Sequence, residues 1–463
     1  MARDKDKAET QSASLYESAK KIYPREQGGR FANLSKLATI VLLGLFYVVP
    51  WLTWDDRQSV LFDLPARKFY IVGLTLWPQD FPYLALLLII AALALFFFTA
   101  LAGRLFCGFA CPQTVWTEAF IWMEQWTEGT RSQRMKLDRA PWSWNKLRRK
   151  GSKQILWITF SLWTGFTFVG YFSPIRQLGL DILALNVGGW TLFWGLFYGF
   201  ATYGNAGFMR EQVCKYMCPY ARFQSAMFDK DTLIISYDEK RGDPRGGRKR
   251  SVDPREVGLG DCIDCTLCVQ VCPTGIDIRD GLQYECIACA ACIDACDEVM
   301  DKMNYPRGLV RYTTEHALTG EKTRVLRPRT FVYATLLLIL TGGLVTSMVT
   351  RTPMILDVIR DRNSLYRELP NGFIENIYTL KLINQSNEAR SFRLSVAGVD
   401  GLVLDGASDT VTVEGGGVLS LPVRARTQRD NAYGIMNISF TAEATDNTSV
   451  AVTEDSRFLG PTP

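Results

Sequence analysis

Five long apolar stretches constrain the fold of this chain more than any other feature. Each approaches or reaches the roughly 20 residues that an α-helix needs to cross a bilayer. None carries the polar stripe that a surface helix of a soluble protein shows along its length. They lie at residues 36–54, 82–103, 154–173, 188–209 and 330–350. The sequence therefore predicts a membrane protein with an α-helical bundle of about five spans, and twelve tryptophans agree with that class.

The distribution of lysine and arginine around these stretches predicts their orientation. Residues 131–153 carry nine lysines and arginines, whereas the next connection has only Arg176. Because positive loops stay in the cytoplasm, we expect residues 1–35 and 210–329 inside and residues 351–463 outside. The mixed charges before the first stretch do not resemble a cleavable signal peptide. The net charge of +5 then reflects topology and contact with membrane lipid, and no nucleic acid partner is expected.

Eight of the twelve cysteines form two runs of the pattern Cys-x2-Cys-x2-Cys-x3-Cys. This is the spacing of bacterial two-cluster ferredoxins, in which the fourth cysteine of each run crosses to the other cluster. Zinc sites use separate Cys-x2-Cys pairs instead, and cytoplasmic thiols seldom form disulfides. We therefore expect two [4Fe–4S] clusters that transfer electrons, although clusters can also serve only as folding staples. The expected ligands are Cys262, Cys265, Cys268 and Cys296 for cluster one, and Cys272, Cys286, Cys289 and Cys292 for cluster two.

The other four cysteines form two copies of Cys-x3-Cys-Pro, which we call the twin motifs. Cys107 and Cys111 follow the second apolar stretch in RLFCGFACPQTVW, and Cys214 and Cys218 follow the fourth in EQVCKYMCPYARF. In a helix this spacing puts both sulfurs on one face, and the proline suits the start of a new helix. The helix N-terminus should lower the pKa of such a thiol. Both stretches run inward, so the four sulfurs are expected at one depth, where they can converge on a metal.

The residues alone leave the identity of that metal open. Thiolates select Cu(I), zinc or iron in clusters, and the spacing also permits a third cluster or merely buried thiols. Met123, Met209 and Met217 are possible thioether ligands, although such methionines mostly pack in cores. The one histidine, His316, lies outside the apolar stretches, and we expect it to be solvated. Bis-histidine haem within the membrane is therefore excluded.

The rest of the chain falls into a linker and a β-rich tail. Residues 238–255 are rich in Gly, Pro and positive charge, which predicts a flexible connection to the ferredoxin unit and a possible contact with anionic lipid. After residue 370 about seven short alternating runs predict an immunoglobulin-like β-sandwich. The expected order is an N-terminal segment (1–35), four spans with the first motif (36–209), a cytoplasmic region with the second motif and an inserted α+β ferredoxin-like domain at about 255–305 (210–329), a fifth span (330–350), and a linker with an all-β immunoglobulin-like sandwich (351–463).

These motifs in this order resemble the cytochrome c oxidase accessory protein family CcoG, also called FixG or RdxA, over essentially the full length. The segments FDLPARKFYIVGLTLWPQDF and VIRDRNSLYRE are similar to that family as well. The resemblance implies a bacterial inner-membrane polyferredoxin with a cytoplasmic ferredoxin domain and a periplasmic tail.

The same resemblance implies a cupric reductase that converts Cu(II) to Cu(I) for assembly of the cbb3-type cytochrome oxidase. Copper would bind Cys107, Cys111, Cys214 and Cys218, and the eight ferredoxin thiolates would hold the groups that relay electrons. The implied partners are copper, oxidase assembly factors or a copper-exporting ATPase, and an electron donor that the sequence does not name. Two alternatives stay open: a relay between the quinone pool and a partner reductase, and a copper carrier without reductase activity.

Overall fold

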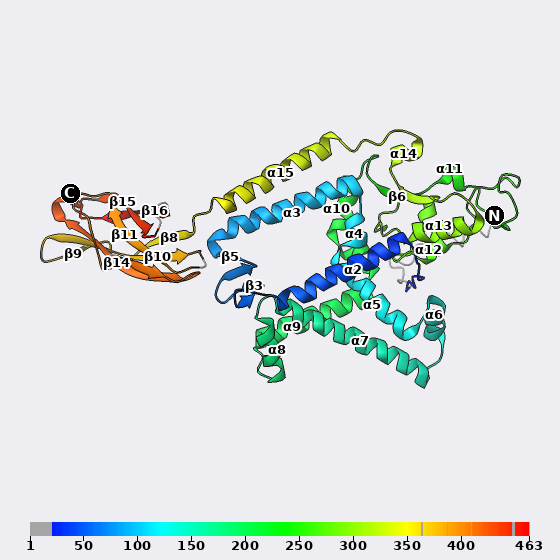
Figure 1. The fold of residues 1–463 in the computed structure, drawn as a ribbon, viewed down its shortest axis with the longest axis horizontal. Helices are drawn as coiled ribbons and strands as arrows, with labels where there is room; N and C mark the ends of the chain where they lie inside the picture. The colour runs from blue at the N-terminus through cyan, green and yellow to red at the C-terminus, as the bar shows by residue number, and fades with distance from the viewer. Residues whose placement is uncertain (1–20, 363, 387, 409, 447–449, 463) are drawn as a thin grey trace, which may run out of the picture. The chain divides into compact units, whose positions relative to one another are not determined.

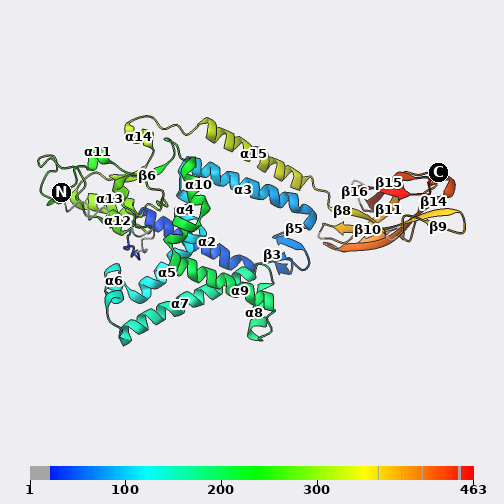
Figure 2. The ribbon, with the colours of Figure 1, turned by 180° about the vertical axis from the view of Figure 1, so that it is seen from behind.

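The computed structural model describes residues 21–362, 364–386, 388–408, 410–446 and 450–462. The chain forms two compact units, residues 1–341 and 342–463, with the division inside helix α15 (Pro328–Val349). The prediction for residues 1–20 of the N-terminal segment lies outside the described residues. Figures 1 and 2 show the first unit as helices with a ferredoxin-like part, and the second as strands β8 to β16.

Three helices in the described part of the chain have the length and composition of membrane spans. They are α2 (Arg30–Val48) with the short 3-10 turn that follows it, α3 (Phe81–Ala102) and α15. The other two expected spans are not confirmed. The third stretch belongs to α7 (Trp144–Val169), which begins with charged residues and buries the hydroxyls of Ser161, Thr164 and Thr167. The fourth is divided between the 14-residue α9 (Gly189–Thr202) and a π-helix, η3 (Tyr203–Met209).

Small residues allow α7 and α9 to pack closely. A Cβ on Gly165 would lie 2.1 Å from the carbonyl oxygen of Gly195, and one on Gly199 would lie 3.2 Å from that of Ser161. Close backbone approach of this kind is typical of helix packing in membranes. A small core of Phe120, Trp157 and Ala206 then joins α7 and η3 to α5 (Pro112–Glu128). Helix α5, which begins at the end of the first motif, therefore packs against this bundle.

The ferredoxin-like part has a buried core of its own. Strands β6 (Ile234–Tyr237) and β7 (Val310–Thr313) pair antiparallel beside α12 (Leu267–Gln270) and α13 (Ala291–Met303). Ile235, Met300 and Leu309 are almost completely buried there. At the start of α2, the backbone N–H groups of Phe31 and Ala32 donate to the carboxylate of Asp294 in α13. The ferredoxin part thus caps a membrane helix, which satisfies N–H groups that have no partner within the helix.

Shorter elements complete the first unit. A three-stranded sheet follows α2, and short helices flank the bundle and the ferredoxin part. Their bounds are β1 (Thr53–Trp54), β2 (Arg57–Gln58), β3 (Val60–Asp63), β4 (Lys68–Ile71), β5 (Leu74–Leu76), α4 (Leu105–Phe109), α6 (Arg131–Arg139), α8 (Ile175–Leu183), the π-helix η4 (Val213–Met217), α10 (Pro219–Met227), α11 (Glu239–Gly242) and α14 (Glu315–Thr319).

The second unit is a β-sandwich, as the alternating pattern predicts. One sheet has the order β12-β14-β10-β8 with β9 paired to β10, and the other has the order β13-β11-β15-β16. Tyr378, Phe392, Phe440 and Phe458 fill the core between the sheets. Sequence reasoning missed β8, which pairs with β10, because it lies in the segment taken as a linker. The strands are β8 (Met354–Arg360), β9 (Arg367–Glu368), β10 (Phe373–Asn384), β11 (Arg390–Ala397), β12 (Val403–Asp405), β13 (Val411–Val413), β14 (Val418–Gln428), β15 (Ile435–Ala444) and β16 (Ala451–Leu459).

Candidate iron–sulfur and metal centre

The eight ferredoxin thiols surround two small cavities in the ferredoxin-like part. One cavity is lined by Cys262, Cys265, Cys268 and Cys296, which we call the first thiol set. The other is lined by Cys272, Cys286, Cys289 and Cys292, the second thiol set, with Cys268 between the two. The remaining walls are largely apolar, with Ile, Leu and Val side chains around both cavities. Each set combines three thiols of one run with the fourth thiol of the other.

The backbone around each set takes an unusual conformation that suits a bound cluster. Asp264 and Thr266 in the first run, and Ala288 and Ala290 in the second, all have a positive φ between 52° and 61°. Turns of this kind bring backbone N–H groups together into an anion-binding concavity, as at many iron–sulfur sites. Thiolate sulfurs carry negative charge, so these residues and the apolar cavities fit a [4Fe–4S] group.

Each twin motif sits at a break between two helices. Cys107 lies in α4, whereas Cys111 is the N-cap of α5, which begins at Pro112. In the second motif Cys214 lies in η4, and Cys218 is the N-cap of α10. The predicted helix starts at both prolines are therefore confirmed. The π-helices η3 and η4 were not predicted, although π-bulges often occur at functional sites.

The four thiols of the twin motifs lie close enough to influence one another. The charges of Cys111 and Cys218 raise the pKa of Cys107, and those of Cys111, Cys107 and Cys218 raise the pKa of Cys214. Burial is the largest cause and raises these pKa values to about 11 and about 12. Among the described residues, no three Cys, His, Asp or Glu side chains form a preformed site for one metal ion. The four thiols of the twin motifs are neighbours, but their side chains must move closer together to bind one metal ion.

The expectation of a lowered thiol pKa at a helix N-terminus is therefore wrong for Cys111. Backbone N–H groups of Thr114 and Gln113 at the start of α5 do lower the pKa of Cys111, but burial raises it by more. Desolvation disfavours the charged thiolate more strongly than the helix N-terminus favours it. A bound cation reverses this balance, because metal binding releases the thiol protons.

The first motif packs directly against the second thiol set. A Cβ on Gly108 would lie 2.8 Å from the carbonyl oxygen of Ile287 and 2.9 Å from the Cα of Cys289. Only a glycine permits this backbone contact. Beside it the buried guanidinium of Arg104 donates to the carbonyl oxygens of Cys286 and Ala221, both at 3.1 Å, and so joins the ferredoxin run to α10. Electrons would therefore have a short path from the second thiol set to the twin motifs.

A cavity of about 260 Å³ connects the two kinds of site. Cys214 of the second motif and Cys289 of the second thiol set both line it, as do Glu118 and Glu211. Burial raises the pKa of Glu118, whose carboxylate accepts a hydrogen bond from Trp122 at 2.9 Å. A small ion or water in this cavity can reach a thiol of each site.

Gln113, two residues after Cys111, ties the start of α5 to the segment that leads into the second motif. Its side-chain amide donates to the carbonyl oxygens of Asn205 at 2.9 Å and Arg210 at 3.1 Å. Arg210 stands four residues before Cys214 and has a φ of 41°, a strained conformation for a residue with a side chain. Such strain persists only where the surroundings hold it.

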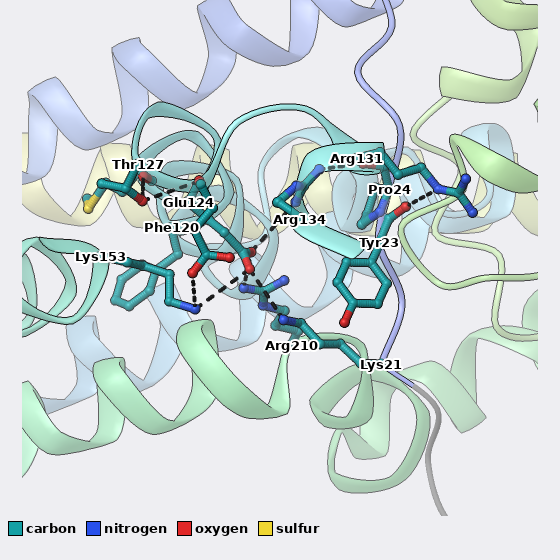
Figure 3. A network of polar contacts seen from close by, with 12 residues as sticks. Lys21, Tyr23, Pro24, Phe120, Glu124, Thr127, Arg131, Arg134, Lys153 and Arg210 are labelled. Atoms are coloured by element: carbon teal, nitrogen blue, oxygen red, sulfur yellow. Dashed lines mark hydrogen bonds and ion pairs between the residues drawn. The ribbon is translucent and has the colours of Figure 1, made fainter. Parts of the chain in front are cut away.

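A buried network of charges supplies that support (Figure 3). The carboxylate of Glu124 in α5 is fully buried and lies 2.6 Å from Arg210, 3.7 Å from Arg134, 3.8 Å from Lys153 and 3.5 Å from Lys21. Burial raises the pKa of Glu124, but the charges of Arg210, Lys21 and Lys153 outweigh burial and hold this pKa below its usual range.

The neighbouring Glu128 is buried as well, and its carboxylate pairs with Lys150 and Lys153, each at 2.9 Å. Sequence reasoning counted these lysines and arginines as topological signals and missed the network. The one feature of the sequence that could have revealed this network is the pair Glu124 and Glu128, four residues apart and followed by many basic residues.

The methionines and the histidine considered as further ligands have surroundings that do not indicate metal binding. Met123 packs against the core of Phe120 and Trp157, and Met217 is exposed. His316 is not simply solvated as expected, because its Nδ1 lies 2.8 Å from a carboxylate oxygen of Asp231 and its ring is three-quarters buried. These neighbours do not point to a metal at His316.

The stretch 238–255, expected to be a free connection, is bonded to the first thiol set. The backbone N–H of Gly246 donates to the carbonyl oxygen of Cys262 at 3.2 Å, and the N–H of Cys262 donates to that of Gly242 at 3.3 Å. The prediction of a flexible linker missed these contacts because they are made by backbone groups of glycines.

Comparisons with known proteins agree with this architecture. Residues 209–315 match a 4Fe–4S dicluster domain, residues 84–129 match a 4Fe–4S binding domain, and residues 344–461 match an Ig-like fold found at the C-terminus of FixG. Protein RdxB of Cereibacter sphaeroides is 41% identical over 422 residues, which are 88% of each chain. Protein RdxA of the same organism is 40% identical, covering 96% of this chain and 94% of RdxA. The nitrogen fixation protein FixG of Rhizobium meliloti is 37% identical, covering 88% of this chain and 87% of FixG.

Proposed function

This chain belongs to the FixG and RdxA family of membrane iron–sulfur electron-transfer proteins, and from that premise we propose that it reduces Cu(II) to Cu(I) for assembly of the cbb3-type cytochrome c oxidase. Copper is the substrate in this proposal. Each Cu(II) ion gains one electron and becomes Cu(I), with no atom transferred. Cys107, Cys111, Cys214 and Cys218 receive the ion.

One observation carries the proposal: the first motif and the second thiol set are in backbone contact at Gly108 and Cys289, and one cavity reaches thiols of both. In the proposed assignment the first thiol set holds one [4Fe–4S] cluster and the second thiol set holds the other. Such clusters, when bound, supply electrons one at a time. The chain itself positions the thiols, excludes water and keeps the sites adjacent.

The chemistry of the thiols favours the reduced product. Cu(I) is a soft ion that prefers thiolates, whereas Cu(II) prefers nitrogen and oxygen ligands in a tetragonal arrangement. Buried thiols with a raised pKa stay protonated until a cation arrives, so they hold little charge without metal. A site lined by partly buried thiols therefore stabilises Cu(I) relative to Cu(II).

The proposal includes a topology with five spans. Besides α2, α3 and α15, the helices α7 and α9 with η3 would cross the bilayer as a closely packed pair. The nine positive charges of residues 131–153 support a cytoplasmic connection, which puts the ferredoxin part inside and the sandwich in the periplasm. A reporter fused after residue 185 tests this topology, because only five crossings put that position outside.

The experiment measures Cu(I) formation by purified protein. The full chain, reduced and supplied with Cu(II), is followed with a Cu(I)-specific chelator, and a Cys107→Ala, Cys214→Ala variant is compared with it. We expect the variant to lose Cu(I) formation while its iron content stays that of the unmodified protein. Equal Cu(I) formation by both proteins would refute the copper site, and binding of copper without reduction would identify a carrier.

A third cluster at the twin motifs is the second candidate, because the match to a 4Fe–4S binding domain spans residues 84–129 and includes Cys107 and Cys111. Two clusters give about eight iron atoms per chain and three give about twelve, since each [4Fe–4S] group has four. Iron and sulfide analysis of the unmodified protein and of the double variant distinguishes the two. A loss of iron in the variant would favour the third cluster.

An apolar cavity supports the quinone alternative. It has a volume of about 880 Å³ and is lined by Phe160, Trp163 and Leu192 among other residues of α5, α7, α8 and α9. An isoprenoid quinone matches such a groove in size and polarity. Oxidation of a quinol by the purified protein, unaffected by the Cys107→Ala, Cys214→Ala changes, would favour this function over copper reduction.

A further inference from the structure

The ferredoxin-like part has one thiol set near the surface and one that faces inward. All twelve cysteines lie in the described part of the chain, and Cys265 of the first thiol set is the one that is exposed. The second thiol set lies against α4, where Gly108 contacts Cys289. The first thiol set, at the face that carries Cys265, is therefore the one accessible to an external electron carrier, and the second faces the twin motifs.

Residues 245–250, a run of positive charge, are hydrogen-bonded to the first thiol set. The sequence RGGRKR, residues 245–250, carries four cations and no acid. Backbone bonds link Gly246 to Cys262, and the guanidinium of Arg248 donates to the carbonyl oxygen of Cys262 at 3.4 Å. These bonds hold the run beside Cys262, three residues before the exposed Cys265. The cations are therefore less mobile than those of a flexible linker.

Arg245 of the run pairs with Asp243 at 3.0 Å, but the other three cations have no charged partner within the described part of the chain. Arg248 donates to the hydroxyl of Tyr305 and Arg250 to the side-chain oxygen of Asn304, and neither partner is charged. Lys249 between them is exposed. No ion pair within 4 Å involves these three residues in the described ranges.

The acids of the same face, in contrast, are already paired. Asp261 contacts Arg241 at 2.6 Å, and Arg279 contacts Asp264 at 2.5 Å and Asp277 at 2.6 Å. These pairs leave Arg248, Lys249 and Arg250 as cations without a charged partner beside the backbone of Cys262. Acids return only at Asp253, beyond the run.

We propose that Arg248, Lys249 and Arg250 form a docking surface for an electron-carrier protein with an acidic face. Complementary charge steers such a carrier to the exposed thiol and orients it there. In each encounter the reduced carrier loses one electron and this chain gains it, with no atom transferred. The proposal rests on the electron-transfer role of the chain and holds whether copper, a quinone or a third cluster accepts the electron. An anionic lipid surface would attract the same cations, but it would not account for their attachment to the backbone of Cys262 in the first thiol set.

The test is a binding measurement that does not depend on turnover. The probe is a strongly acidic plant-type ferredoxin, titrated against the full-length protein in detergent at rising salt. The Lys249→Glu, Arg250→Glu double variant is compared with a matched control, Lys322→Glu, Arg324→Glu, which reverses two exposed cations on the segment before α15. We expect the first variant to lose about tenfold or more in affinity at low salt and most of its salt dependence, since exposed charges are screened beyond about 10 Å at 0.1 M salt. The control should bind as the unmodified protein does.

Three outcomes would overturn the proposal. The first is an unchanged affinity for the ferredoxin in the Lys249→Glu, Arg250→Glu variant. The second is an equal loss of affinity in the control. The third is that the unmodified protein does not bind the ferredoxin, while the variant loses binding to anionic vesicles. The last outcome would assign the patch to lipid. Visible spectra and iron content of every variant verify that the clusters are intact, so a folding defect is recognised separately. Failure of copper reduction in the unmodified protein, with carrier binding intact, would refute the proposed function and leave this inference standing.

Discussion

Replacement of Glu124 by glutamine tests whether the buried charge network supports the twin motifs. Glu124 is the only carboxylate near Arg134 and Arg210 in the described part of the chain, so the change leaves two buried cations without a counter-ion. Arg134 is fully buried and keeps its hydrogen bond to the carbonyl oxygen of Pro24. Removal of one partner from a buried ion pair typically costs about 3–5 kcal/mol of unfolding free energy. We expect a loss in that range.

Glu128→Gln is the matched control, because Glu128 is buried to the same degree in the same helix. Its two partners keep other carboxylates: Lys150 retains Asp138 and Lys153 retains Glu124. No cation is left alone, so the expected loss is smaller, about 1–3 kcal/mol. Glu128 does not contact Arg210, and Glu128→Gln should leave the second motif in place.

Two measurements test whether the charge network around Glu124 supports the twin motifs. Thermal or denaturant unfolding of both variants in detergent gives the order of the losses, and competition with a chelator gives the affinity for Cu(I). We expect Glu124→Gln to weaken Cu(I) binding at least tenfold and Glu128→Gln to leave it within a factor of two, each at unchanged iron content. These fold-changes follow from a displacement of Arg210, and a tenfold change is about 1.4 kcal/mol. Equal effects of the two variants on Cu(I) affinity, or a larger stability loss in Glu128→Gln, would refute the reasoning.

Three further changes test other contacts. Gly108→Ala places a methyl group against backbone atoms of the second thiol set and should slow Cu(II) reduction with little change in iron content, whereas Gly179→Ala, with open space around it, should act as the unmodified protein in the same stopped-flow assay. Gln113→Ala removes both bonds from the start of α5 to the segment before the second motif and should lower the affinity for Cu(I) without changing the visible spectrum of the clusters; an unchanged affinity would show that the amide does not position the second motif. Burial raises the pKa of Asp138, but bonds from neighbouring Lys and Tyr side chains hold this pKa far below its usual range, so its contribution to stability is complete above the usual carboxyl pKa of about 4 and is lost as pH falls below it. Asp138→Asn should therefore lower stability at neutral pH and flatten the acid side of the pH profile, as unfolding measured from pH 3 to 7 would reveal.

Local pattern was enough to predict much of this protein. The spacing of the ferredoxin cysteines, the prolines that start helices after Cys111 and Cys218, and the alternation of strands in the tail are all local features, and the structure has each of them where the sequence places it. Apolar length likewise identified α2, α3 and α15. These features depend on neighbours along the chain, so periodicity and spacing reveal them.

The sequence by itself therefore determined the kinds of element and the candidate thiols, and tertiary structure decided how they meet. The contact of Gly108 with Cys289, the tie from Gln113 to Arg210 and the ion pair of Glu124 with Arg210 join residues about 90 to 180 positions apart. Tertiary structure also reversed the expected thiol pKa, because burial depends on every element that packs around a sulfur, whereas a helix N-terminus is visible in the local sequence. Packing between distant segments leaves no periodic trace in a single sequence, which is why the thiols were predictable and their surroundings were not.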